Sequence, residues 1–339
     1  MRSEITIDLG ALRRNVRTLV RAADGAEVWA VVKADAYGHG ALDCATAALD
    51  AGARALCVAT VGEALPLRRE LPNARLLVLG PASDDELADA RRAGLELVVS
   101  SDRIPEGVLV HVKLDTGMGR WGVSELPAPT RAVVGVMTHL ATADTDTDFA
   151  LAQIERFRVA TDSLAHLTRH VANSAAALRI PESRFDAVRC GIALYGLSPF
   201  GRDPAEDGLE PVLSWVTELA QTKRLRAGES TGYGRLFVAE RDTWIGILPL
   251  GYADGFRRDL TGTVLRVDGE TCKVVGAVSM DAIAVELDRE LSPGAPVTIV
   301  GPGLPLEQHA RVAGTLTYEL ACGIQSSPPR ARRVVVDAA

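Results

Sequence analysis

The fold is constrained most by a regular alternation of short apolar runs with longer segments of helical spacing between residues 11 and 189. The apolar runs lack a polar face, which is typical of strands that are buried on both sides of a parallel sheet. Segments such as 62–71, 84–93 and 149–167 lie between them and have helical spacing. The strand-like runs are 28–33, 55–60, 75–80, 95–100, 108–115, 133–140, 170–172 and 187–189.

Eight strand-like runs that alternate with helices predict an α/β fold, a closed (β/α)8 barrel of the TIM type. An open doubly wound sheet is the main alternative. The barrel is favoured because no antiparallel run interrupts the alternation before Ser198.

The pattern changes after residues 199–201, where short strand-like runs are separated by Gly and Asp turns. These runs are 212–219, 244–248, 264–267, 272–275 and 297–300. We therefore expect a barrel over residues 1–205, with a linker near 204–208, and a mostly β domain over residues 206–339. Residues 1–10 contain an alternating run, and we expect this leading strand to join the second domain. The basic tail at 328–333 is interpreted as a solvated terminus.

Composition excludes several classes of function. The chain has 37 basic and 44 acidic residues and a net charge of -7, and its basic residues are scattered or interleaved with acidic ones, so nucleic acid is not an expected partner. Its five cysteines are far apart and form no CxxC pair, which indicates a reducing compartment. We found no apolar run long enough for a bilayer and no signal-peptide core, so we expect a cytoplasmic protein without membrane contact.

No metal site is expected either. His166 and His170 have the i, i+4 spacing of a metal pair on a helix, but no third ligand is near in the sequence. We interpret them as surface histidines at a helix end. Residues 117–122 match the GxGxxG dinucleotide fingerprint. The segment that follows, 123–129, is a poor helix start, so this match does not predict a nucleotide site.

Lys33 stands where an apolar run stops and the glycine-containing loop 38–40 begins. Many such lysines simply extend into water, but an amine in a partly dry pocket can attack a carbonyl. The loops after the seventh and eighth strands, at 173–174 and 191–192, are where barrels usually bind phosphate. An amine for an aldehyde and a site for a phosphate together predict a pyridoxal phosphate site.

The segment 30–40, with Lys33 at its centre, closely resembles the pyridoxal phosphate attachment motif of the alanine racemase family. Further family segments are matched in order at 113–120, 137–144, 172–174, 188–196, 232–235 and 250–255. The resemblance spans nearly the whole chain. It implies an isomerase that interconverts L-alanine and D-alanine, supplies D-alanine for peptidoglycan, and forms a homodimer with shared active sites.

The resemblance also implies roles for individual residues. Lys33 would hold the cofactor as a Schiff base, and Lys113 matches a lysine that is often carbamylated and orients an arginine. The other implied cofactor contacts are Tyr37, Asn173, Ser174, Gly191 and Ile192 around the phosphate, Arg189 at the pyridine nitrogen, His139 beside the ring, Arg120 at the phenolic oxygen, and Ser326 where the family usually has a tyrosine.

Racemisation needs a base on each face of the planar carbanion, because a proton returned to the face it left restores the same enantiomer. The resemblance assigns one face to Lys33 and the other to Tyr233 of the partner subunit. The implied substrate contacts are Arg120, Tyr252, Met280 and Asp281. Three alternatives stay open: a serine or broader-specificity racemase, a non-catalytic pyridoxal-phosphate-binding protein, and a decarboxylase of related fold.

Overall fold

The computed structural model describes residues 2–337. Met1 and Ala338–Ala339, which we assigned to the β domain, lie outside the described residues. The described chain forms two compact units, one made of residues 11–200 and 204–210 and the other of residues 2–10, 201–203 and 211–337. Residues 204–208, where the sequence suggests a linker, include the 3-10 turn η4 (Pro204–Asp207) and belong to the first unit. Within residues 2–337, no helix is both long and apolar enough to cross a membrane.

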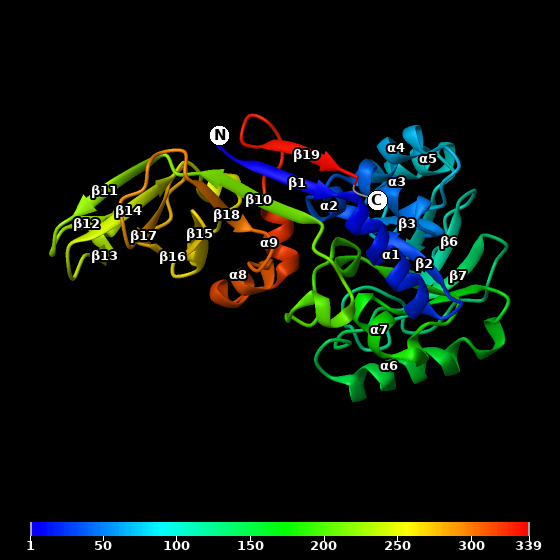
Figure 1. Cartoon of the computed structure of the whole chain (residues 1–339). Coiled ribbons are helices and arrows are strands. Elements are labelled where there is room, and N and C mark those ends of the chain that lie inside the picture. The colour runs from blue at the N-terminus through cyan, green and yellow to red at the C-terminus, as the bar shows by residue number, and fades with distance from the viewer. Residues whose placement is uncertain (1, 338–339) are drawn as a thin grey trace. The chain divides into compact units, whose positions relative to one another are not determined.

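The first unit is a closed parallel barrel, seen at the right of Figure 1. Within the described residues its strands are β2 (Glu27–Val31), β3 (Ala55–Val58), β4 (Leu76–Val78), β5 (Glu96–Val99), β6 (Leu109–Lys113), β7 (Val133–Met137), β8 (Thr168–His170) and β9 (Ala187–Cys190). Strand β2 pairs in parallel with both β3 and β9, and this pairing closes the ring. The predicted (β/α)8 barrel is therefore confirmed.

Helices cover the outside of the barrel. They are α1 (Leu9–Ala23), α3 (Ala41–Asp50), α4 (Val61–Glu70), α5 (Asp84–Arg92), α6 (Thr147–Ala160) and α7 (Ser174–Arg179). Helices α4 and α5 begin with capping boxes, Thr60 with Glu63 and Ser83 with Glu86, which satisfy the first backbone N–H groups. The helix expected over 149–167 ends at Ala160 and is followed by the 3-10 turn η1 (Asp162–Leu164).

The second unit is mostly β, as predicted. Among the described residues it holds a nine-stranded sheet in the order β11-β14-β17-β16-β15-β18-β10-β1-β19. The strands are β1 (Glu4–Asp8), β10 (Leu213–Glu218), β11 (Gln221–Leu225), β14 (Thr243–Leu248), β15 (Val264–Val267), β16 (Glu270–Val275), β17 (Ile283–Leu287), β18 (Pro296–Val300) and β19 (Arg332–Val336). Strand β1 pairs antiparallel with β10 and parallel with β19. Two helices, α8 (Leu306–Ala313) and α9 (Thr317–Gly323), complete the unit.

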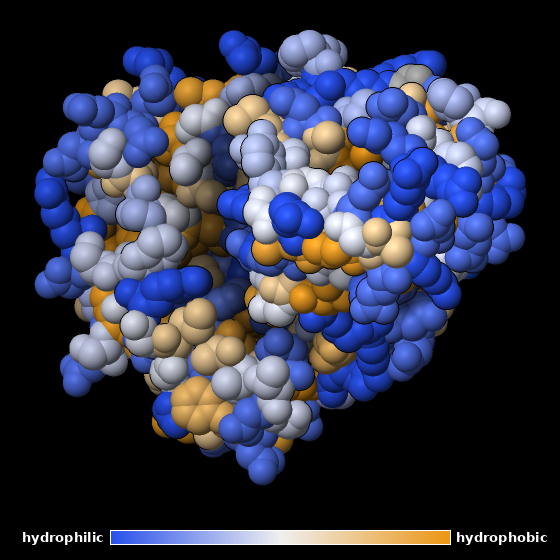
Figure 2. Space-filling model, turned by 90° about the vertical axis from the view of Figure 1, so that its left-hand side faces the viewer, coloured by the Kyte–Doolittle hydropathy of each residue, from blue (hydrophilic) through white to orange (hydrophobic). Residues whose placement is uncertain are grey.

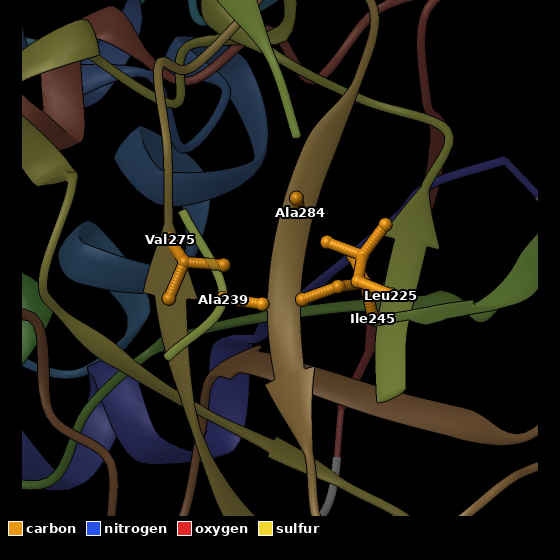
Figure 3. Close-up of a cluster of buried hydrophobic side chains, with 5 residues drawn as sticks. All are labelled: Leu225, Ala239, Ile245, Val275 and Ala284. Carbon is orange, nitrogen blue, oxygen red and sulfur yellow. The ribbon is translucent and has the colours of Figure 1, made fainter. Parts of the chain in front are cut away.

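A small hydrophobic cluster lies beneath the hairpin of β12 (Ser230–Thr231) and β13 (Phe237–Val238). Figure 3 shows its five buried members, Leu225, Ala239, Ile245, Val275 and Ala284, and Phe237 and Ile247 pack against them. The cluster joins the base of this hairpin to the main sheet. Elsewhere, hydrophobic residues reach the surface in places among hydrophilic ones (Figure 2).

Candidate active site

Lys33 lies two residues after the end of β2, with Val32 between them, and begins the short turn α2 (Lys33–Tyr37). The four residues after it, from Ala34 to Tyr37, all have left-handed backbone angles, with φ between 51° and 55°. Left-handed helical geometry costs an L-residue about 1–2 kcal/mol, so the surrounding structure must hold this turn in place. The Glu63 carboxylate accepts a hydrogen bond from the Ala34 amide at 2.8 Å, and the Asp35 carboxylate accepts one from the amide of residue 41 at 2.7 Å.

Ser174 and Gly191 follow β8 and β9, and β9 pairs with both β8 and β2. The loops that carry Ser174, Gly191 and Lys33 therefore start from neighbouring strands. The Ser174 hydroxyl accepts a hydrogen bond from the Gly191 amide at 3.0 Å. A Cβ on Gly191 would lie 2.5 Å from the Tyr37 hydroxyl, so the bare backbone at this position is required. Tyr37, Ser174 and Gly191 are all residues that the sequence resemblance assigns to a phosphate, and for that expectation we call them the phosphate pocket.

Two further predicted cofactor contacts lie beside the phosphate pocket. Ile192 is buried and begins the 3-10 turn η3 (Ile192–Tyr195). The Asn173 side chain caps α7 by accepting a hydrogen bond from the Ala176 amide at 3.0 Å. The Asn173 side-chain oxygen is therefore already used to cap the start of α7.

Arg189 is buried in β9, where its guanidinium is surrounded by acceptors. It donates hydrogen bonds to the backbone carbonyls of Thr138, His170 and Val171 at 2.8–3.0 Å. Burial lowers the pKa of Arg189 to about 10, which still leaves the side chain charged at neutral pH.

His139 lies 3.3 Å from Arg189, measured between His139 Nδ1 and Arg189 Nη2. Burial and the positive charges of Arg189, Lys113, Arg120 and Lys33 lower the pKa of His139 to about 3. The imidazole is therefore neutral at physiological pH and can accept the hydrogen bond from the guanidinium.

The loop after β6 is built on Asp115. Its carboxylate accepts hydrogen bonds from the amides of Gly117, Met118 and Gly119 at 2.9–3.1 Å, and the bond from Gly117 contributes most to a lowered pKa of Asp115. This loop presents Arg120, which is exposed. No helix forms over residues 123–131, so the glycine pattern here belongs to a turn, as expected.

Lys113 ends β6 and is buried. Burial, followed by the nearby charges of Arg120 and Arg189, lowers the pKa of Lys113 to about 8. The Lys113 amine and the Arg120 guanidinium lie 5.8 and 5.3 Å from the ring centre of Trp121. Lys113 and Arg120 are thus neighbours, with Trp121 against both.

Tyr233 lies in the second unit, at the start of the 3-10 turn η5 (Tyr233–Arg235) between β12 and β13. Its side chain is 75% exposed. The flanking Gly232 and Gly234 have φ of 78° and 69°, a conformation that favours glycine. The Arg235 side chain donates to Ser230 at 3.1 Å and closes the turn.

Tyr252 and Met280 are held together by backbone contacts. The Tyr252 amide donates to the Ser279 carbonyl at 3.0 Å, and a Cβ on Gly251 would lie only 2.1 Å from that carbonyl oxygen. Both Tyr252 and Met280 are partly exposed, at 42% and 50%.

Asp281 pairs with two arginines of the same unit, Arg330 and Arg2, the latter at 3.1 Å. The hydrogen bond from Arg330 lowers the pKa of the Asp281 carboxyl. Ser326 is half-buried and follows Gln325, whose amide donates to the Asp254 carbonyl at 3.1 Å. Asp254 ends the turn that begins with Tyr252, so Ser326 and Tyr252 belong to adjoining segments.

One expectation about the histidines is wrong. His170 is fully buried at the end of β8, where its ring contacts Arg189 and His111. The expectation failed because α6 ends at Ala160, so the helical spacing of His166 and His170 has no structural meaning. His111 was missed altogether, although a histidine inside an apolar strand run is a signal for a buried polar group.

The groups at the barrel mouth fit pyridoxal phosphate in their chemistry. Lys33 offers an amine for an aldehyde, the phosphate pocket offers hydroxyls and an amide next to a position that tolerates no Cβ, and Arg189 offers a buried cation for a ring nitrogen. A barrel with these groups, followed by a mostly β unit, defines the class of barrel enzymes that bind pyridoxal phosphate.

Comparison with known proteins gives the family. The family model for "Alanine racemase, N-terminal domain" matches residues 7–199, and that for "Alanine racemase, C-terminal domain" matches residues 212–332. Alanine racemase 1 of Bacillus subtilis is 39% identical over 96% of this chain and 91% of its own length. The chain belongs to the alanine racemase family, whose members are pyridoxal-phosphate-dependent isomerases.

Solved structures of alanine racemases have the same fold as this chain. An alanine racemase from Streptomyces coelicolor is 37% identical, with a TM-score of 0.90 over 99% of this chain and 98% of that one. The alanine racemase from Bacillus anthracis, solved with bound L-Ala-P, is 32% identical, with a TM-score of 0.87 over 99% and 95% of the two chains.

Proposed function

We propose that the protein interconverts L-alanine and D-alanine, with pyridoxal phosphate bound at the mouth of the barrel, and so supplies D-alanine for peptidoglycan in the cytoplasm. The observation that carries this proposal is the origin of Lys33, Ser174 and Gly191 at the ends of the neighbouring strands β2, β8 and β9. When bound, pyridoxal phosphate supplies an electron-withdrawing ring that makes the Cα proton of an attached amino acid acidic.

Lys33 and Tyr233 serve as the two bases. The Lys33 amine takes up or returns the Cα proton on one face of the substrate, and the Tyr233 hydroxyl does so on the other. Each turnover moves one proton onto one base and one proton off the other, so the configuration at Cα is inverted and the composition of the amino acid is unchanged.

Tyr233 acts in the site of a second subunit, in a head-to-tail homodimer. The exposure of this residue supports that assignment, because Tyr233, Leu236 and Met280 are 75%, 72% and 50% exposed in the single chain. Exposed aromatic, leucine and methionine side chains are typical of interfaces between proteins.

Arg189 would face the pyridine nitrogen and, as a permanent donor, would leave that nitrogen unprotonated. His139, neutral and bonded to Arg189, lies beside the ring. Arg120 binds the phenolic oxygen and the substrate. Lys113, with its pKa lowered to about 8, is neutral in roughly a tenth of molecules at pH 7. The neutral amine is the form that reacts with carbon dioxide, which supports carbamylation of Lys113 and pairing of the carbamate with Arg120.

The remaining substrate contacts come from the second unit. The Met280 amide binds the substrate carboxylate and Tyr252 narrows the entrance, which limits the side chain to a small one. Asp281 is engaged with Arg2 and Arg330, so it holds the Met280 segment in place. Ser326 would contribute a hydroxyl to the phosphate with a shorter reach than a tyrosine, a difference that a bridging water could fill.

The direct test is chiral chromatography of L-alanine incubated with the cofactor-loaded protein, with L-serine in a parallel sample. We expect D-alanine to accumulate toward an equal mixture of the two enantiomers. Absence of D-alanine with the cofactor still bound would overturn the proposal. Faster formation of D-serine would assign the protein to the serine or broader-specificity class.

Two variants test the assignment of the bases. Lys33→Ala should lose both activity and the absorbance of the bound cofactor. Tyr233→Phe should keep the cofactor and lose racemisation by at least a hundredfold, in line with the 10²–10⁴-fold that general acid–base groups typically contribute. Tyr318→Phe, in α9 of the same unit, is the matched control and should be fully active. Full activity of Tyr233→Phe would refute the two-base assignment.

A further inference from the structure

A row of polar side chains crosses the interior of the barrel from Arg189 to Glu96. Arg189 Nη1 lies 2.8 Å from His170 Nδ1, His170 Nε2 lies 2.8 Å from His111 Nδ1, and His111 Nε2 lies 2.8 Å from Glu96 Oε2. Both histidines are fully buried. We call Arg189, His170, His111 and Glu96 the histidine chain; none of the roles proposed above explains His170, His111 or Glu96.

The direction of every hydrogen bond in the histidine chain is fixed by its two ends. A guanidinium can only donate and an ionised carboxylate can only accept. His170 therefore accepts at Nδ1 and donates from Nε2, and His111 does the same in turn. Both imidazoles are neutral Nε2–H tautomers, and burial, which lowers the pKa of each, favours the neutral form.

The barrel makes specific room for these rings. Gly135 of β7 is in register with His111, and a Cβ at this glycine would lie 2.0 Å from His111 Nδ1. The register of β6 against β7 is also irregular between Val110 and His111. The Trp29 ring packs against both imidazoles, with centroid distances of 4.6 Å to His170 and 5.7 Å to His111.

The far end of the histidine chain is anchored as an anion. Arg75 donates to both oxygens of Glu96, at 2.8 and 3.0 Å. Burial alone would raise the pKa of Glu96, but the hydrogen bonds from His111 and Arg75 outweigh it and hold the pKa at about 2. A buried polar row of this kind costs free energy unless every member is satisfied. Here each link is satisfied, and a fixed negative charge is connected to a buried cation.

We propose that Glu96 and His111 are positioning residues, which act through His170 to hold the Arg189 guanidinium in one orientation and thereby keep the cofactor's ring nitrogen unprotonated. The link to the ring nitrogen rests on the function proposed above. The physical reason is that reversal of the histidine chain would bring an N–H of His170 against an N–H of Arg189. The Glu96 carboxylate forbids that reversal because it can only accept a hydrogen bond from His111.

Glu96→Gln is the informative variant, because a glutamine amide can donate to His111 and so permits the reversed chain while its size is nearly unchanged. Glu27→Gln is the matched control. Glu27 lies 3.8 Å from the same Arg75 and accepts a hydrogen bond from Trp29 Nε1 at 2.8 Å, which a glutamine oxygen can also accept, while the His111 ring is bonded to Glu96 instead. Glu96→Asp retains the anion and should stay close to the parent protein.

The first readout needs neither cofactor nor activity. Long-range ¹H–¹⁵N NMR of the histidine side chains should show His111 and His170 as neutral Nε2–H tautomers in the parent protein and in Glu27→Gln. In Glu96→Gln both His111 and His170 should shift toward the Nδ1–H tautomer, because a flip of one ring alone would leave two N–H groups facing each other. An Nδ1–H or protonated form of either ring in the parent protein would overturn the inference, whatever the variants do.

The second readout is the side reaction of the cofactor-loaded protein. Alanine that gives its amino group to the cofactor leaves as pyruvate, and a protonated ring nitrogen favours that outcome. Pyruvate formed per D-alanine should rise at least tenfold in Glu96→Gln and stay unchanged in Glu27→Gln and Glu96→Asp. Equal ratios in Glu96→Gln and Glu27→Gln would refute the control of the ring nitrogen. Failure of the proposed function is distinguishable, because the parent protein itself would then form no D-alanine.

Discussion

Gly191→Ala should weaken the binding of pyridoxal phosphate by displacing the Tyr37 hydroxyl from the phosphate pocket. The new methyl would lie 2.5 Å from Tyr37 Oη and 3.0 Å from Tyr37 Cζ. Tyr37 is buried, with its ring centre 5.0 Å from that of Tyr195, so the hydroxyl can only move away from the pocket. A hydrogen bond to a charged group contributes about 1.5–3 kcal/mol, which corresponds to a Kd about 10- to 150-fold higher.

The assay is an equilibrium titration of the apoprotein with pyridoxal phosphate, followed by absorbance, for Gly191→Ala, Tyr37→Phe and the double variant. Both single changes take the same hydroxyl out of the phosphate pocket, one by displacing it and the other by removing it. The Kd of the double variant should therefore lie within about threefold of that of Tyr37→Phe, well short of additivity. Urea unfolding of each apoprotein shows whether the fold is intact. An unchanged Kd in Gly191→Ala, or full additivity of the two changes, would refute the reasoning.

The other predictions concern stability. Glu96 has a folded pKa of about 2 against an ordinary 4.5, so it should stabilise the fold above pH 4.5 by about 3 kcal/mol. That contribution is lost as the pH falls toward 2. The free energies of unfolding in urea of the parent protein and Glu96→Gln should therefore converge over this range, and a constant difference between them would contradict the prediction. Gly135→Ala, whose Cβ would lie 2.0 Å from His111 Nδ1, should lower the free energy of unfolding by about 1–3 kcal/mol. In a protein that already carries His111→Ala, the same glycine substitution should cost much less. Asp254→Asn weakens an acceptor that is 2% exposed and 2.9 Å from the Gly251 amide; it should cost about 1–3 kcal/mol in thermal unfolding and raise KM more than it lowers kcat, since the turn carries Tyr252.

Most strands of the barrel could be predicted from the sequence because strands buried on both faces are continuous apolar runs. The exception is β8 (Thr168–His170), which is polar and overlaps the run expected at 170–172 only at His170. Strands that are polar or lie at the edge of a sheet could not be predicted in this way. Gln221–Leu225 reads as a polar segment, yet it forms β11 because the apolar Leu225 is anchored in the cluster of Figure 3. Arg332 and Arg333, interpreted as part of a solvated tail, begin β19, which pairs in parallel with β1. Pairing between the two ends of a chain leaves no local pattern.

In the candidate site, too, local sequence features could be predicted, whereas contacts made only by the folded barrel could not. A lysine at a strand end and glycines at later strand ends are local features, so Lys33 and Gly191 could be predicted as candidates. The histidine chain could not, because His111 and His170 meet only through the closure of the barrel and the absence of a side chain at Gly135. The left-handed turn after Lys33 was equally hidden, since alanine does not favour that conformation.

The pairing of β1 with β10 and β19 has a consequence for synthesis on the ribosome. Strand β1 leaves the exit tunnel long before its neighbours and can pair with the first of them only when residues 213–218 follow, and with the second only with residues 332–336. The strands of the barrel, which end at Cys190, are all available earlier. A nascent chain released near residue 210 should thus hold a folded barrel with a protease-sensitive amino terminus. That terminus would become resistant only in the finished chain.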